Sequence, residues 1–236
     1  MVSAGGTREA IDPVRFIGNR STGRMGVAVA EAAAARGARV TMVAASMEVE
    51  PPAGAEVVHV ESTAELRTAL HRLTHEADGS AGFDALVMAA AVSDYRPTTT
   101  ATRKLERGKG LTLELEATPD ILGQIARIAR GTDREGDQTY EPMSPRPFLV
   151  GFAAETGSLE RAGEKLRRKG VDLIVANDVA EPGSGFGTET NRVTFLDADG
   201  GRDELPLLSK REVADRLLDR VARALDERDH AAQTGS

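Results

Sequence analysis

Short apolar runs alternate with amphipathic segments along the first half of the chain. An apolar run without polar alternation is typical of a strand in a parallel sheet that is covered on both faces. Apolar residues at helical spacing predict amphipathic helices between such strands. The expected strands are 1–4, 38–46, 55–62 and 83–94, and the expected helices are 23–36 and 63–77. This order predicts an α/β fold with a Rossmann-like, doubly wound, mostly parallel sheet and helices on both faces.

The second half of the chain is less regular. It has one alternating run with a polar face, two apolar runs, three helical patterns and a hairpin through Asp-Gly-Gly. These are the strands 111–117, 148–155 and 171–178, the helices 118–130, 158–169 and 209–227, and an irregular hairpin at 192–208. The polar, Pro-rich segment 131–147 predicts a flexible loop, and 229–236 a frayed tail. No internal repeat occurs, and residues 1–236 are expected to form one domain.

Composition narrows the classes of function. The chain has 236 residues, of which 40% are hydrophobic, enough for a sizeable core. A net charge of -7 argues against nucleic-acid binding, and the absence of Cys excludes disulfides, thiolate metal sites and a cysteine nucleophile. No apolar run is long enough to span a bilayer, so no membrane contact and a cytoplasmic location are expected. His71 and His75 are spaced like metal ligands, but no third ligand accompanies them, and no protein metal site is predicted.

The segment GGTREAIDPVRFIGNRSTGRMG, residues 5–26, predicts a binding loop. Gly5 and Gly6 end the first strand, and two further glycines begin the first helix. Glycine lets backbone N–H groups approach a phosphate, and a helix N-terminus favours an anion. The segment departs from the P-loop, because Arg24 and Met25 replace its Lys and its Ser or Thr, and it lacks the dinucleotide fingerprint. We therefore predict an anion cradle; the alternative is that the glycines only shape a turn.

Three further polar features are candidate ligand contacts, each with a simpler alternative. Asp94 follows an apolar strand, where doubly wound folds place ligand contacts, yet such an Asp also caps turns. Lys104 stands in a basic loop that could close over a triphosphate, or it is solvated surface charge. Lys165 and Lys169 lie one helical turn apart and could clamp phosphates. Cations are also favourable at a helix C-terminus, and for this pair that alternative is the stronger one from the residues alone.

Five segments, in this order, resemble one family: AGGTREAIDPVRFIGNRSTGRMG, AAAVSDYRP, TPDIL, GFAAET and ANDV. Over residues 2 to about 226 the chain resembles the phosphopantothenoylcysteine synthetase domain of coenzyme A biosynthesis. The resemblance implies a ligase that uses CTP, with Mg²⁺ on its phosphates, to convert 4'-phosphopantothenate into an acyl-cytidylate. The amine of L-cysteine then displaces CMP. The choice of CTP over ATP is implied by bacterial relatives alone.

The resemblance also implies roles for individual residues. Asn19 matches an asparagine that handles the acyl-cytidylate, and Lys104 matches the first lysine of a loop at the triphosphate; these are the predicted catalytic residues. Arg15, Asn19 and Asn177 are the predicted substrate contacts. The predicted nucleotide contacts are Gly5, Gly6, Asp94, Pro119, Asp120, Ile121, Leu122, Phe152, Lys165 and Lys169. The family loop often reads Lys-x-Lys-Lys, whereas this chain reads KLER, so the later lysines have no counterpart.

The resemblance further implies a homodimer with a shared active site. It implies a bifunctional parent chain with a flavin-dependent decarboxylase upstream, which forms a higher oligomer, and the abrupt first strand suggests an excised domain.

Two other classes of function stay open. One is an NAD(P)-dependent oxidoreductase on the same scaffold, which the missing dinucleotide fingerprint and the missing Tyr-x-x-x-Lys oppose. The other is a regulatory subunit that binds CTP without releasing pyrophosphate.

Overall fold

A computed structural model describes residues 1–74, 82–108, 110–132, 134–135, 138–139 and 141–234. Its centre is an eight-stranded sheet in the order β15-β14-β12-β11-β6-β1-β4-β5. The strands are β1 (Val2–Ala4), β4 (Thr41–Ala44), β5 (Glu56–His59), β6 (Ala85–Met88), β11 (Phe148–Glu155), β12 (Leu173–Asp178), β14 (Thr194–Asp197) and β15 (Arg202–Glu204). Neighbours from β12 to β5 pair in parallel, and β14 and β15 add an antiparallel edge. The predicted fold class is confirmed, and the C-terminal hairpin joins the main sheet.

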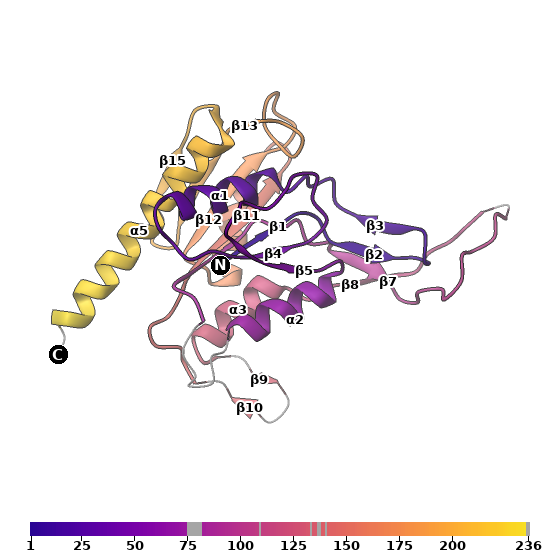
Figure 1. Cartoon of the computed structure of the whole chain (residues 1–236), viewed down its shortest axis with the longest axis horizontal. Helices are drawn as coiled ribbons and strands as arrows, with labels where there is room; N and C mark the ends of the chain where they lie inside the picture. The colour runs from indigo at the N-terminus through magenta and orange to yellow at the C-terminus, as the bar shows by residue number, and fades with distance from the viewer. Residues whose placement is uncertain (75–81, 109, 133, 136–137, 140, 235–236) are drawn as a thin grey trace.

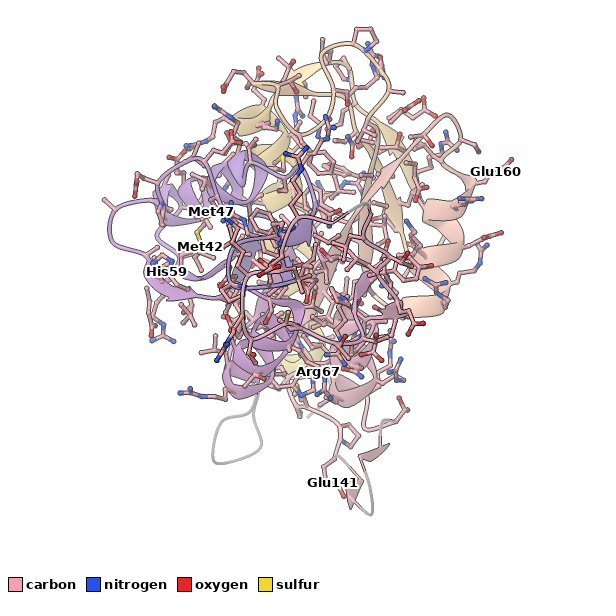
Figure 2. All side chains as sticks on the ribbon, turned by 90° about the vertical axis from the view of Figure 1, so that its right-hand side faces the viewer. Met42, Met47, His59, Arg67, Glu141 and Glu160 are labelled. Carbon is pink, nitrogen blue, oxygen red and sulfur yellow. The ribbon has the colours of Figure 1, made fainter. Side chains whose placement is uncertain are left out.

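Helices cover both faces of this sheet, as Figure 1 shows. The helices are α1 (Arg24–Ala35), α2 (Thr63–Thr74), α3 (Ile121–Ala129), α4 (Glu160–Lys169) and α5 (Lys210–Thr234). One apolar core lies under α1 and α5, and a second lies under α2, α3 and α4. In Figure 2, Arg67 lies between α2 and α3, where its Nε donates a hydrogen bond of 2.9 Å to Gln124. The same view places His59, on edge strand β5, and Glu160, at the start of α4, on opposite sides of the molecule.

Helix α1 packs directly on β1 at Gly26. A Cβ built at Gly26 would lie 2.5 Å from the Cβ of Ala4 and 3.1 Å from its Cα, closer than side chains normally approach. The position therefore requires glycine, because the helix backbone itself contacts the strand. This contact places the N-terminus of α1 at the carboxyl end of β1.

We expect Gly26→Ala to lower the free energy of unfolding by about 1–3 kcal/mol, because overpacking against β1 outweighs the gain in helix propensity. For a chain of this size the midpoint temperature would fall by about 2–10 °C, measured by circular dichroism. Gly163→Ala in α4 is the matched control, because its Cβ would meet only Arg167 Nη1, at 3.8 Å. That variant should melt at or slightly above the wild-type temperature. Equal midpoints for the two variants would refute the close contact.

Two short strand pairs, which we call the arm (residues 8–18, 95–108 and 110–117), project beside the main sheet (Figure 1). Strand β2 (Arg8–Ala10) pairs with β3 (Phe16–Gly18), and β7 (Tyr95–Pro97) pairs with β8 (Leu115–Ala117), both antiparallel. Strands β2 and β7 contact each other. The sequence predicts a loop where β2 and β3 form. The strand predicted at 111–117 forms only in part, as β8, and it pairs in the arm.

The remaining segments refine the predicted boundaries. Strands β9 (Arg134–Glu135) and β10 (Gln138–Thr139) pair within the predicted flexible loop 131–147; residues 133, 136–137 and 140 lie outside the described residues, and the flexibility of this loop stays a prediction. Strand β13 (Thr190–Asn191) pairs with β16 (Leu208–Ser209). Helix α5 continues to Thr234, where the sequence predicts a tail, because no Pro or Gly interrupts the helical pattern before then. Residues 75–77 of the second predicted helix and residues 235–236 of the tail are not described. Among the described residues, no helix combines the length and apolar character of a membrane span.

Candidate active site

A pocket with a cavity of about 60 Å³ lies beside the N-terminus of α1, at the carboxyl ends of β6, β11 and β12. Phe152 from β11 and Asn177 from β12 both line it, so the structure brings these two predicted site residues together. The other lining residues include Thr22, Gly23, Arg24, Ala89, Phe186 and Lys210. Typical ligand pockets are several times larger, so a nucleotide bound here would extend beyond this cavity.

The N-terminus of α1 gives the pocket a positive end. Gly23 is the N-cap residue, with a φ of 80°, and no side chain caps the helix there. The first turn contains no acidic residue. The backbone N–H groups of this turn therefore favour an anion, as the sequence predicts for the glycines at this end of the loop. Arg24 adds a positive charge nearby and pairs with Glu189.

Lys210, the first residue of α5, is buried beneath segment 183–191, which covers one side of the pocket. Its Nζ donates hydrogen bonds to the carbonyl oxygens of Gly185, at 2.9 Å, and Thr188. Burial lowers the pKa of Lys210; the charge of Glu189 opposes this shift and that of Arg24 adds to it. Lys210 was not predicted as a site residue, because a lysine at the start of an amphipathic helix indicates a solvated position and no sequence signal marked its burial.

The two lysines of α4 are both held by carboxylates. Lys165 Nζ donates to Glu155 Oε1 at 2.7 Å, and Lys169 pairs with Asp120. Asp120 is also the N-cap residue of α3 and accepts the N–H of Gly123 at 3.1 Å. Burial raises the pKa of Asp120, but the hydrogen bond and charge of Lys169 outweigh it and hold this pKa below its ordinary value. The PDIL turn (residues 119–122) and Lys169 are therefore neighbours.

The predicted nucleotide contacts lie on two faces of the sheet. Along β11, Val150 and Phe152 pack toward the core under α1 and α5, whereas Leu149 and Ala153 pack toward the core under α2, α3 and α4. Phe152 is thus on the opposite face from the lysines of α4. A ligand that contacts both Phe152 and these lysines must therefore pass over the carboxyl end of β11. Successive side chains of a strand point to opposite faces of the sheet, so recognising residues 148–155 as a strand could have revealed this division.

The four residues of the PDIL turn, 119–122, differ in how far their side chains are exposed. Ile121 and Leu122 are buried in the core, so only their backbone groups can reach a ligand. Pro119 is exposed, and the side chain of Asp120 is partly exposed, at 37%. Asp94 is exposed as well, and its carbonyl oxygen accepts the N–H of Thr118 at 2.9 Å, which joins Asp94 to this turn.

The loop after β1 is held by hydrogen bonds to other loops of the protein. The N–H of Gly6 donates to the carbonyl of Ser46 at 2.9 Å, and Gly5 has a φ of 85°. The amide of Asn19 donates to the carbonyl of Ala91 at 3.0 Å. The Gly6 N–H is therefore already engaged, and the anion-favouring end of the loop lies at α1 instead. Nucleotide contact at Gly5 and Gly6 and the role of Asn19 stay predictions.

Lys104 and Arg15 lie on the arm. The Ala101 N–H donates to the carbonyl of Ile11 at 3.0 Å, and the guanidinium of Arg15 donates to the carbonyl of Leu105 at 2.6 Å. These bonds place the segment that carries Lys104 along the hairpin formed by β2 and β3. The predicted catalytic lysine is thus positioned by a different part of the fold from Phe152 and Asn177.

The family model for the DNA/pantothenate metabolism flavoprotein C-terminal domain matches residues 1–225. The chain belongs to this family. Two relatives named coenzyme A biosynthesis bifunctional protein CoaBC are each 43% identical to it, from Bacillus subtilis over 225 residues and from Mycobacterium tuberculosis over 229 residues. Each match covers 94% of this chain, and 50% and 51% of the two relatives. The chain spans about half the length of these curated relatives.

Three solved structures have folds similar to that of this chain. The crystal structure of the C-terminal domain of CoaBC has a TM-score of 0.72 and 35% identity, and the match covers 96% of this chain and 94% of that one. The DNA/pantothenate metabolism flavoprotein from Streptococcus pneumoniae has a TM-score of 0.75 and 21% identity, covering 94% and 97%. A Cab2 mutant in complex with phosphopantothenate-cysteine has a TM-score of 0.71 and 16% identity, covering 98% and 87%. The last two show the shared fold alone.

Proposed function

We propose that this chain is a cytoplasmic ligase of coenzyme A biosynthesis that joins 4'-phosphopantothenate to L-cysteine at the expense of CTP. The observation that carries the proposal is the match to the C-terminal domain of CoaBC, at 35% identity over nearly the whole of both chains. The Cab2 structure, which has the same fold, holds phosphopantothenate-cysteine, the product that this reaction would form. Family membership disfavours the oxidoreductase alternative.

The reaction has two steps in this proposal. A carboxylate oxygen of 4'-phosphopantothenate attacks the α-phosphorus of CTP, an acyl-cytidylate forms and pyrophosphate leaves. The amine of cysteine then attacks the acyl carbon, an amide forms, CMP leaves and the amine loses a proton. Mg²⁺ would accompany the CTP phosphates and offset their charge. In the described part of the chain, no three His, Asp or Glu side chains gather as a metal site, so the phosphates are its proposed ligands.

In this proposal, several side chains would serve these steps. Lys165 and Lys169 would exchange Glu155 and Asp120 for phosphate oxygens, which accept charge-assisted hydrogen bonds in the same way. Lys104 would neutralise charge that develops on the leaving pyrophosphate. The amide of Asn19 would hold the acyl phosphate without adding charge.

We further infer that the chain forms a homodimer through the arm. Large apolar side chains are exposed there: Val14, Phe16, Tyr95, Leu111 and Leu115, with exposed fractions from 45% to 61%. Exposed apolar residues that gather on one projecting element are typical of an interface. Such a dimer would bring the arm of one protomer, with Lys104 and Arg15, toward the pocket of its partner. An upstream decarboxylase and a higher oligomer stay predictions.

The wild-type chain is expected to release pyrophosphate when it is given CTP, Mg²⁺ and 4'-phosphopantothenate, and release should continue over many turnovers once L-cysteine is added. Without cysteine, release should stop at about one equivalent per site, because the acyl-cytidylate stays bound. An enzyme-coupled pyrophosphate assay measures both phases. ATP in place of CTP tests nucleotide choice. No release with either nucleotide would refute the ligase, and CTP binding without release would favour the regulatory subunit.

A further inference from the structure

Asp12 is a buried carboxylate in the arm, at the turn between β2 and β3, with 2% of the residue exposed. Its two oxygens have different partners. Oδ1 accepts the backbone N–H groups of Val14, at 2.8 Å, and Arg15, at 2.9 Å, which closes the turn. Oδ2 accepts Nε and Nη2 of Arg15, at 2.9 and 2.5 Å, and the N–H of Leu105, at 3.1 Å.

Leu105, which follows Lys104 directly, is therefore held through both of its backbone groups. Its N–H donates to Asp12, and its carbonyl accepts Nη2 of Arg15 at 2.6 Å. The Asp12–Arg15 pair thus clamps the two peptide units on either side of Leu105, across more than eighty residues of sequence. Lys104 itself is exposed and extends from this fixed point.

We propose that Asp12 is a positioning residue for Lys104, acting through the backbone of Leu105 and with Arg15 as the second half of the clamp. The inference rests on the proposed function, in which Lys104 meets the triphosphate. The next lysine along the chain is Lys109, five residues after Lys104. A long side chain can deliver its charge reproducibly only from a fixed backbone.

The electrostatics of the turn keep the clamp intact at neutral pH. Burial raises the pKa of Asp12, but the hydrogen bonds from Leu105, Val14 and Arg15 outweigh it and hold this pKa well below its usual range. The carboxylate is therefore ionised wherever the enzyme works. A charged acceptor makes stronger hydrogen bonds than a neutral one, which suits it to hold a peptide unit.

Asp12→Asn is the variant that separates the clamp from the turn. An amide oxygen at the Oδ1 position would still accept the N–H groups of Val14 and Arg15. An NH₂ group at the Oδ2 position would face the N–H of Leu105 and the guanidinium of Arg15, donor against donor. Asp215→Asn is the matched control, because Asp215 is also bonded to an arginine, Arg36, but on α5, away from the arm.

The first measurement is limited proteolysis with trypsin, which cleaves after Lys104. The bond it cuts ends at the Leu105 N–H that Asp12 holds. We expect Asp12→Asn to speed cleavage at this bond about tenfold, measured by mass spectrometry, whereas Asp215→Asn should leave it unchanged. Cleavage of Asp12→Asn at the wild-type rate would show that the clamp does not hold the segment, whatever the activity of the protein.

The second measurement is a double-mutant cycle with Lys104→Gln, read as single-turnover pyrophosphate release. Asp12→Asn alone should slow release about 10–100-fold, but less than about twofold in the Lys104→Gln background, because the two changes remove the same contribution. Leu105→Pro, which removes the N–H that Asp12 holds and leaves the Asp12 turn unchanged in sequence, should slow release at least as much as Asp12→Asn and keeps the test usable should the first variant fail to fold. A full Asp12→Asn penalty in the Lys104→Gln background would overturn the inference. A wild type that releases no pyrophosphate would overturn the proposed function itself, whereas an active wild type with an equally active Asp12→Asn would overturn only the inference.

Discussion

Lys104→Gln is expected to slow pyrophosphate release by about 10²–10³-fold, the cost of removing one preorganised stabiliser of transition-state charge. Glutamine keeps a polar side chain of similar reach but carries no charge. Because Lys104 is exposed, its replacement should leave folding unchanged. Single-turnover release with saturating CTP and 4'-phosphopantothenate measures the chemical step, and a circular dichroism melt checks the fold.

Arg107→Gln is the matched control for this variant. Arg107 lies in the same exposed segment, so its replacement lowers the local charge by the same amount. Release should then change by less than about threefold, since exposed charges are screened by solvent and salt. An equal loss in both variants would mean that the segment acts through its total charge and that Lys104 has no specific role.

The sequence predicted the sheet well because its central strands are apolar runs. Strand β11 reads FLVGFAAE, and a strand buried on both faces needs apolar side chains at nearly every position. The arm was not predicted, because its strands are not apolar runs. Strand β3 has no buried residue, and the hairpin of β2 and β3 also bonds to the distant residues Ala101 and Leu105. Local patterns contain little information about such contacts.

The site residues divide in the same way: the sequence identifies some of them, and only contacts between distant segments identify the others. Lys169 and the PDIL turn were grouped by the family resemblance, and the structure joins them through Asp120. Lys210 and Asp12 were not found, because a buried charge looks like any exposed charge in a sequence. The carbonyl groups around Lys210 and the Leu105 N–H at Asp12 identify them, and these groups come from distant segments.

Lys104 and Lys169 are held by different elements of the fold, and this has a consequence for catalysis. Within one protomer, the backbone bonds of residues 100–105 run to the β2–β3 hairpin, whereas Lys169 lies on α4 and pairs at the start of α3. If the apolar arm forms the dimer interface, Lys104 would complete the site that contains Lys169 of the partner subunit. Each active site would then take its two lysines from different chains.

Mixing Lys104→Gln with Lys169→Gln is therefore expected to restore activity that neither variant has alone. After subunit exchange, half of the dimers are mixed, and each mixed dimer has one site that lacks both substitutions. Pyrophosphate release should recover to about a quarter of the wild-type rate. If Lys104 serves its own protomer, every site contains one substitution and no activity returns.

The reverse mixture provides the control. A chain with both substitutions, mixed equally with wild type, should give about a quarter of full activity when the lysines act across the interface, because each substitution then damages a different site of the mixed dimer. It should give about half when they act within one chain, because the wild-type protomer keeps its site whole. If the lysines act across the interface, the first mixture has more activity, and the second mixture less, than if they act within one chain. A loss of activity through misfolding or failed exchange cannot imitate both results.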